Sequence, residues 1–166
     1  MKRVVPAAIA VSAALLAACG TTTMTAGIGA TLGTGSLRVT VDRFDPHPPM
    51  PPSDVTGLSR PAPGNRLVAG HVHLCTNIGP AIGTWDFSVA LSGGGRGTPN
   101  NVATNYPQRF DSLRTGCSVG WIVFQVPQES RPTSIDFAFD DTGDSAGAHP
   151  TRGETHVRFS WTIAAR

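Results

Sequence analysis

The strongest β-strand signal in this chain is the stretch GCSVGWIVFQVP, which runs from Gly116 to Pro127. Its second half is β-branched or aromatic at nearly every position, and Pro127 cannot donate a backbone hydrogen bond to a neighbouring strand. Because strand side chains alternate, Ile122, Phe124 and Val126 are expected on one face. The other face is then expected to carry Cys117, Trp121, Val123 and Gln125. We therefore predict a central strand that ends at Pro127.

Five further stretches alternate apolar and polar residues, which is typical of half-buried strands. They are residues 37–42, 67–76, 85–91, 135–140 and 156–163. Val102 to Phe110 has a weaker pattern and is expected to form a short edge strand interrupted at Pro107. Turn-forming residues separate them, and Gly93 to Gly97 are expected to form a flexible reversal. The rest of the chain shows no helical apolar stripe outside the first 18 residues. The predicted fold class is all-β, an immunoglobulin-like two-sheet antiparallel β-sandwich of about seven strands.

The N-terminus has the pattern of a secretion signal. Lys2 and Arg3 precede an apolar run from Val4 to Leu16, which is short for a membrane span. The next residues, Leu16-Ala17-Ala18-Cys19-Gly20, resemble a bacterial lipobox, in which the cysteine receives a diacylglycerol. We therefore predict a lipoprotein signal peptide over residues 1–18 and a lipid anchor at Cys19, on the extracytoplasmic face of the cell membrane. The alternative is an ordinary secreted protein.

Composition divides the remaining chain into two parts. Residues 19–36 are threonine, glycine, alanine and little else, which predicts a flexible tether. Residues 37–166 are then expected to form one β-sandwich domain. Loss of Lys2 and Arg3 with the signal leaves eleven basic against eleven acidic residues, and the remaining arginines are scattered. This distribution argues against a nucleic-acid partner.

Two cysteines remain if Cys19 is lipidated. An even number of cysteines in an exported chain favours a disulfide. Cys75 ends one predicted strand and Cys117 begins the central strand. If these strands are antiparallel neighbours, the two thiols share a face, and their Cα atoms should lie about 4.4–6.8 Å apart. We predict a Cys75–Cys117 disulfide, the alternative being two free structural thiols.

Several of these motifs carry a family resemblance. They are Asn65 to Val68, Cys75 to Gly79, Leu113 to Gly116 and Gly120 to Pro127. Together they resemble the uncharacterised telokin-like family of bacterial secreted proteins and lipoproteins, over residues 37–163. The chain is also similar to mycobacterial secreted immunogenic sandwich proteins. The resemblance implies an immunoglobulin-type sandwich in a bacterial envelope. Its motifs are structural, so it implies no chemistry.

The pair His71 and His73 is the main candidate for chemistry. Residues i and i+2 of a strand project from the same face, so two imidazoles could share one copper or zinc ion. Cys75 follows in the same row, and His149 or His156 could complete a site if the fold brings them close. The alternative is two surface histidines on the outward side of a strand.

Two other motifs are weaker. Gly116 to Gly120 match the G-x-S-x-G nucleophile elbow around Ser118, with Asp136 and His156 following in hydrolase order. That elbow needs a helix after the serine, whereas a strand-forming run follows here. Asp140 to Asp144 offer oxygen ligands for calcium without the spacing of an EF-hand, so a solvated hairpin loop is expected.

These observations predict a lipid-anchored, non-enzymatic binding or interaction module of the cell envelope. Its expected contacts are the membrane, through the N-terminal lipid, and an envelope protein or ligand. No cofactor is expected. The alternative function is an extracytoplasmic copper- or zinc-binding protein that uses His71 and His73.

Overall fold

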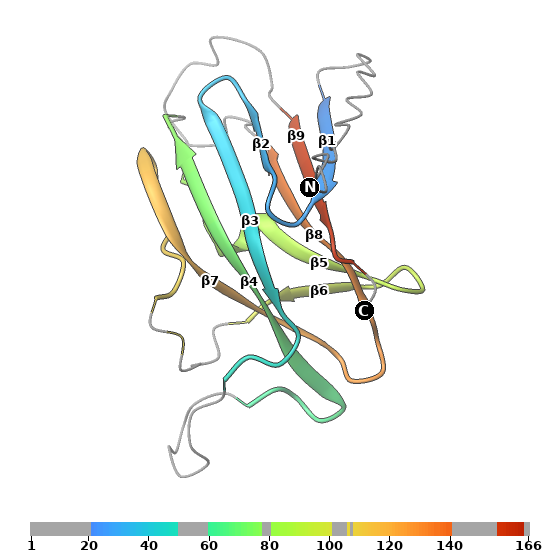
Figure 1. The fold of residues 1–166 in the computed structure, drawn as a ribbon. Helices are drawn as coiled ribbons and strands as arrows, with labels where there is room; N and C mark the ends of the chain where they lie inside the picture. Colours follow the sequence, from blue (N-terminus) through green and yellow to red (C-terminus); the bar gives the residue numbers. More distant parts are fainter. Residues whose placement is uncertain are drawn as a thin grey trace, which may run out of the picture.

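The computed structural model describes residues 21–49, 60–77, 81–100, 106, 108–140 and 156–164. Within these residues the chain is all-β, with nine strands and one short 3-10 helix (Figure 1). In chain order the elements are β1 (Thr21–Gly27), β2 (Thr31–Thr34), β3 (Leu37–Asp45), β4 (Asn65–Thr76), η1 (Thr84–Asp86), β5 (Phe87–Leu91), β6 (Arg96–Pro99), β7 (Gly116–Pro127), β8 (Pro132–Asp140) and β9 (His156–Thr162).

The strands form a mixed sheet that folds over into two facing layers. The strand order is β1-β9-β8-β5-β6-β7-β4-β3-β2, and β6 joins the layers because it pairs with β5 on one side and β7 on the other (Figure 1). The longest pairing is between β4 and β7, which run antiparallel from Asn65 opposite Pro127 to Thr76 opposite Gly116. This pairing confirms the predicted strand from Gly116 to Pro127 and its antiparallel neighbour.

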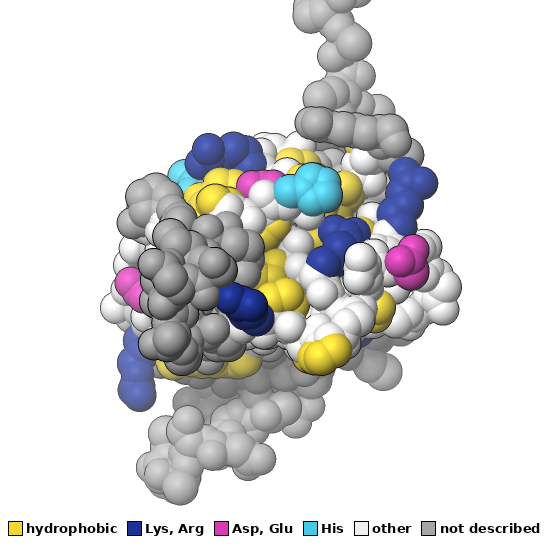
Figure 2. Space-filling view, turned by 90° about the horizontal axis from the view of Figure 1, so that it is seen from below, with side chains coloured by type: hydrophobic (Ala, Val, Ile, Leu, Met, Phe, Trp, Pro, Cys, Tyr) yellow, Lys and Arg dark blue, Asp and Glu magenta, His cyan; other side chains and the backbone are white. Residues whose placement is uncertain are grey.

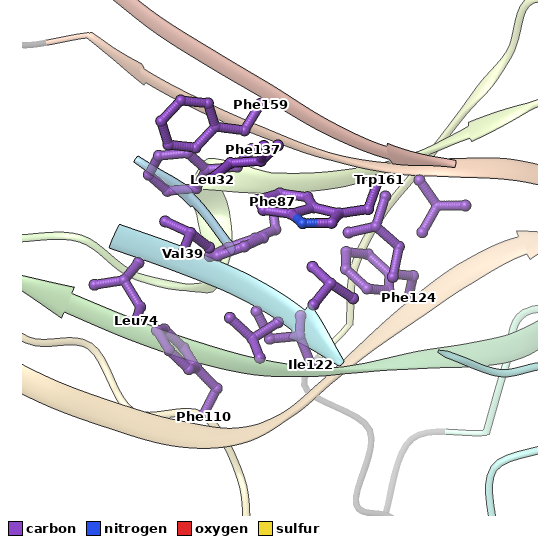
Figure 3. Packing of buried hydrophobic residues seen from close by; sticks show 14 of the residues in the cluster. Leu32, Val39, Leu74, Phe87, Phe110, Ile122, Phe124, Phe137, Phe159 and Trp161 are labelled. Atoms are coloured by element: carbon purple, nitrogen blue, oxygen red, sulfur yellow. The ribbon is translucent and has the colours of Figure 1, made fainter. Parts of the chain in front are cut away.

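The core lies between the two layers. Ile122, Phe124 and Val126 of β7 are buried there, as their alternation predicts, and they face aromatic side chains of β5, β8 and β9 (Figure 3). The indole of Trp161 is buried and donates a hydrogen bond to the backbone oxygen of Ala30 (2.8 Å). Each fully buried apolar side chain of this size stabilises the fold by about 1.5–3 kcal/mol. The facing aromatic residues therefore hold the layers together.

The predicted tether over residues 19–36 is wrong from Thr21 onward. β1 pairs in parallel with β9, and β2 pairs with β3. Threonine is β-branched and suits a strand, and the neighbouring strands supply the apolar bulk that this segment lacks. Leu32 is buried in the core. The folded part therefore starts before Leu37, and the described residues form nine strands in a mixed sheet rather than seven in an antiparallel one.

Three smaller predictions also need correction. Trp85 lies in η1 and is 63% exposed, so β5 begins two residues later than expected. Only the first part of the predicted glycine reversal is a turn, because Arg96 and Gly97 already belong to β6. Within 102–110 the structure describes 106 and 108–110, where Arg109 makes a single bridge to Trp121 instead of a strand.

Several sequence predictions concern residues outside the described ranges. They include the signal peptide, the lipid anchor at Cys19, His149 and most of the Asp140 to Asp144 loop. His156 begins β9, but its side chain is also outside the description. The described residues include no helix with the length and apolar character needed to cross a membrane.

Candidate metal centre

A β-bulge in β3 sets up the candidate site. Leu37, Val39 and Val41 point into the core, but the register against β4 shifts between Val41 and Arg43. A bulge places two residues opposite one on the partner strand and re-aims a side chain. Asp42 is the extra residue, and its carboxylate lies beside the imidazoles that β4 carries on its outward face.

Three potential metal ligands meet at this point: Asp42, His71 and His73. One ligand atom from each lies within 4.8 Å of the others. Nδ1 of His71 hydrogen bonds to Oδ1 of Asp42 at 2.7 Å, and Nε2 of His73 lies 3.5 Å from Oδ2 of the same carboxylate. The two histidines therefore lie on one face, as predicted. The third donor is an aspartate from the neighbouring strand, which the sequence prediction missed.

The two histidines differ in burial. The side chain of His71 is 9% exposed, whereas that of His73 is 46% exposed. The ring of His71 packs 5.0 Å from that of Trp121, and Trp121 borders a small second apolar cluster on this outer face. The description of both histidines as surface residues is thus wrong for His71. The site has one fixed, buried ligand and one ligand open to solvent.

Aromatic and charged residues extend the site along β7. Trp121 stacks on Tyr106 with ring centroids 4.1 Å apart, and the guanidinium of Arg43 lies 5.1 Å from the Trp121 ring. The Tyr106 hydroxyl donates a hydrogen bond to Asp45 (2.7 Å). Burial raises the pKa of Tyr106 well above its usual value, and the hydrogen bond and negative charge of Asp45 raise it further, whereas Arg43 lowers it. This network holds Trp121 against His71.

Arg43 acts on the site through its charge. Its Nε lies 3.8 Å from Oδ2 of Asp42, and its side chain is mostly exposed. Arg43 therefore pairs with the same carboxylate oxygen that faces His73. A cation bound at the site would lie near this positive charge. Arginines elsewhere are distributed around the face in Figure 2 rather than gathered at one point.

The predicted disulfide is present between Cys75 and Cys117, which lie directly opposite each other on β4 and β7. Their Cα atoms are 4.1 Å apart, slightly closer than the range expected from the sequence. A bridge between residues 42 positions apart stabilises a fold by about 4 kcal/mol in the chain-entropy description. Since Cys75 is held by Cys117, it is not a ligand of the candidate site while the bridge is intact.

Ser118, the serine of the G-x-S-x-G match, lies within β7 opposite Leu74. Its hydroxyl donates a hydrogen bond to the backbone oxygen of Asp111 (3.0 Å). Strand continues on the C-terminal side of Ser118, so the turn into a helix that a nucleophile elbow requires is missing there. Asp136 accepts hydrogen bonds from Ser134 and Ser160, which occupy its carboxylate on β8.

The ligand cluster has the donor chemistry of a transition-metal site. Two imidazole nitrogens and a carboxylate oxygen suit zinc or copper better than calcium, which takes oxygen ligands. Ligands of a tetrahedral zinc ion at about 2.0–2.1 Å lie roughly 3.3 Å from one another. His71 lies 2.7 Å from Oδ1 of Asp42 and His73 lies 3.5 Å from Oδ2, while all three ligand atoms lie within 4.8 Å of one another. Side-chain rotations would bring the three ligand atoms to the distances that an ion requires, and His73 is the ligand on the solvent side.

Comparison with known proteins identifies the fold alone. No protein-family model matches the chain, and no curated protein matches it by sequence. Among solved structures, the secreted protein MPT63 from Mycobacterium tuberculosis aligns over 84% of this chain and 97% of its own, with 14% identity and a TM-score of 0.51. At this identity the likeness extends to the fold and to nothing else.

Two other solved structures align less well. One is a candidate lipoprotein from Bacillus subtilis, with 11% identity and a TM-score of 0.46 over 80% of this chain. The alignment covers 38% of that protein, so this chain spans well under half of its length. The other is an uncharacterised β-sandwich protein from Clostridium difficile, with 9% identity and a TM-score of 0.45 over 84% of this chain and 93% of its own.

Proposed function

We propose that this protein is a lipid-anchored, non-enzymatic binding module of the extracytoplasmic cell envelope, and that its ligand is a divalent zinc or copper ion. Asp42, His71 and His73 would hold the ion. The observation that carries this proposal is the approach of three ligand atoms to within 4.8 Å on a bulged sheet face. Asp42 follows Arg38 and Thr40 on the outward face of β3, and at the bulge its carboxylate lies beside both imidazoles.

The location rests on sequence features. The secretion signal and the lipobox at Cys19 support a lipid anchor on the outer side of the cell membrane. Cys75 and Cys117 form a disulfide, and disulfides persist outside the cytoplasm. The telokin-like motifs support an immunoglobulin-type sandwich in which function lies on a face or a loop. A protein partner of the envelope would then meet the module outside the membrane.

The chemistry of the site is binding rather than catalysis. A zinc ion would displace the proton shared between His71 and Asp42, because a metal ligand must be deprotonated. The buried ring of His71 fixes one coordination direction, and the exposed His73 closes on the ion from the solvent side. Solvent or a ligand atom of a partner would fill the remaining position.

Zinc titration of the purified protein with its disulfide intact tests this function. We expect one equivalent of zinc to shift the imidazole NMR signals of His71 and His73 and to leave His47 unchanged, because His47 lies outside the ligand cluster. Asp42→Asn should weaken zinc binding at least about tenfold, whereas Asp111→Asn, an exposed carboxylate elsewhere, should not. If the imidazole NMR signals of His71 and His73 do not change when zinc is added, the cluster is only a hydrogen-bonded network and the module binds something else.

A further inference from the structure

The outward face of β4 carries three potential metal ligands in one row. His71, His73 and Cys75 follow each other at i, i+2 and i+4, and side chains at this spacing share a face. On β7, Cys117 lies opposite Cys75 and Val119 lies opposite His73. His73 thus lies between His71 on one side and the disulfide on the other.

The disulfide is accessible from solvent. Cys117 is exposed and Cys75 is half-buried on the same outer face. Exposed disulfides are the ones that thiols reach, and these bonds tend to be regulatory rather than purely structural. Since β4 and β7 are joined by twelve consecutive residue pairs, their backbone pairing does not depend on the bridge alone.

We propose that reduction of the Cys75–Cys117 disulfide creates a second metal site, made of His73 and the two cysteine thiolates, which takes copper(I). Two thiolates and one imidazole form a soft ligand set, and soft thiolate ligands select copper(I) over harder ions. Cys117 lies directly opposite Cys75, and His73 is two residues from Cys75 on the same strand, so the three side chains share one outer face. This inference rests on the proposed function in one respect, since His73 serves both sites.

The chemical step balances with a dithiol as the reductant. The dithiol gives two electrons and two protons, its own two sulfurs join in a disulfide, and the Cys75–Cys117 bond breaks to leave two thiols. Copper(I) then displaces both thiol protons and binds the resulting thiolates. In the reverse step a disulfide of the same class as the oxidised dithiol takes up two electrons and two protons and becomes a dithiol, while the Cys75–Cys117 bond re-forms and copper(I) is released.

Because both sites use His73 as a ligand, only one of them can hold an ion at a time. In the oxidised protein His73 pairs with Asp42 and His71 to hold zinc or copper(II). In the reduced protein it turns to Cys75 and Cys117, and the first site loses its solvent-side ligand. The redox state of the disulfide would therefore select which ion the module carries.

The test is a competition for copper(I) between the purified full-length protein and a chromophoric copper(I) chelator. The protein is measured oxidised and after reduction with a phosphine. We expect the reduced protein to bind one copper(I) at least about 100-fold more tightly than the oxidised protein. His73→Ala and Cys117→Ser should each remove most of that gain. His71→Ala should abolish zinc binding by the oxidised protein and leave copper(I) binding by the reduced protein intact.

Three results would overturn the inference. The first is equal copper(I) affinity in the two redox states, and the second is tight binding that survives His73→Ala. The third is loss of the β-sheet circular dichroism on reduction, because the site needs β4 and β7 paired. The Cys75→Ser, Cys117→Ser double variant serves as the control, since it lacks the bridge and both thiolates of the proposed site while keeping Cys19. Zinc binding by the oxidised protein is scored separately, so failure of the second site leaves the first site standing, and the reverse also holds.

Discussion

Among single residues, Arg43 is expected to lower the affinity of the candidate centre for a cation. Its guanidinium lies 3.8 Å from Asp42 and competes with any bound cation for that carboxylate. We expect Arg43→Gln to raise zinc affinity by up to about fivefold, since an exposed charge pair is worth about 0.2–1 kcal/mol. Zinc titrations at low salt measure this gain, which added salt should reduce. Arg114→Gln, an exposed arginine in a loop, is the matched control, and a fall in affinity for Arg43→Gln would count against the account.

Tyr106 provides a second test because it is the sole tyrosine of the chain. Burial and the contact with Asp45 raise its pKa, so its tyrosinate absorbance should appear only well above the usual value of about 10. Asp45→Asn removes the negative charge and should lower the pKa of Tyr106, whereas Asp111→Asn should not. An unchanged titration in Asp45→Asn would mean that the contact is absent in solution.

The raised pKa of Tyr106 also fixes the sign of a pH effect on stability. Above pH ~10 the unfolded chain releases the Tyr106 proton while the folded protein keeps it. The folded state then binds more protons than the unfolded state, so the free energy of unfolding falls as the pH rises. This contribution is fully present below the unfolded pKa and is lost progressively above it. Chemical denaturation at a series of alkaline pH values measures it against Tyr106→Phe.

At the level of the strands, Gly120 lies where β7 contacts the segment that contains Arg109 and Phe110. A Cβ at Gly120 would overlap the backbone of Arg109 and Phe110. That segment is held by hydrogen bonds from Trp121 N to Gln108 O (3.0 Å) and from Phe110 N to Trp121 O (3.1 Å). We expect Gly120→Ala to destabilise the fold by about 1–3 kcal/mol through overpacking.

Urea denaturation checks this expectation against Gly27→Ala, where no atom lies within 4 Å of the added Cβ. Because Trp121 also packs on His71, Gly120→Ala should weaken zinc binding along with stability. A fully stable Gly120→Ala variant would show that the crossing segment does not approach β7 as closely as described.

Strands with one buried face could be predicted from the sequence because burial imposes a period of two. Ile122, Phe124 and Val126 carry that pattern plainly. β1 escaped prediction because its parallel partner β9 lies more than a hundred residues away, and no local pattern indicates a pairing at that distance. Its threonines also resemble the composition of a linker.

The candidate site was predicted in part for a similar reason. His71 and His73 could be placed on one face from their spacing. Asp42 could not be assigned to them without the partner strand, although one signal was present: the alternation of Val39 and Val41 breaks at the consecutive polar residues Asp42 and Arg43 before Phe44 turns inward. Two adjacent polar residues followed by a change of phase are typical of a bulge.

At the scale of the whole molecule, the proposed anchor is the point to test. We expect Cys19→Ala to release the protein from the membrane fraction, because about 0.8 kcal/mol per buried methylene is lost with each acyl chain. Cell fractionation and immunoblotting measure the release. A Cys75→Ser, Cys117→Ser variant is the control for cysteine loss and should stay with the membrane. A Cys19→Ala protein that is processed and still membrane-bound would contradict the anchor.

The position of a bound zinc ion decides whether Asp42, His71 and His73 form a metal site. Crystals of the oxidised protein grown with one equivalent of zinc, with anomalous diffraction recorded at the zinc edge, locate the ion without reference to affinity. We expect a single strong peak about 2.0–2.2 Å from an imidazole nitrogen of His71, an imidazole nitrogen of His73 and a carboxylate oxygen of Asp42. A peak bound elsewhere on the protein, or no peak in crystals of the folded protein, would contradict it.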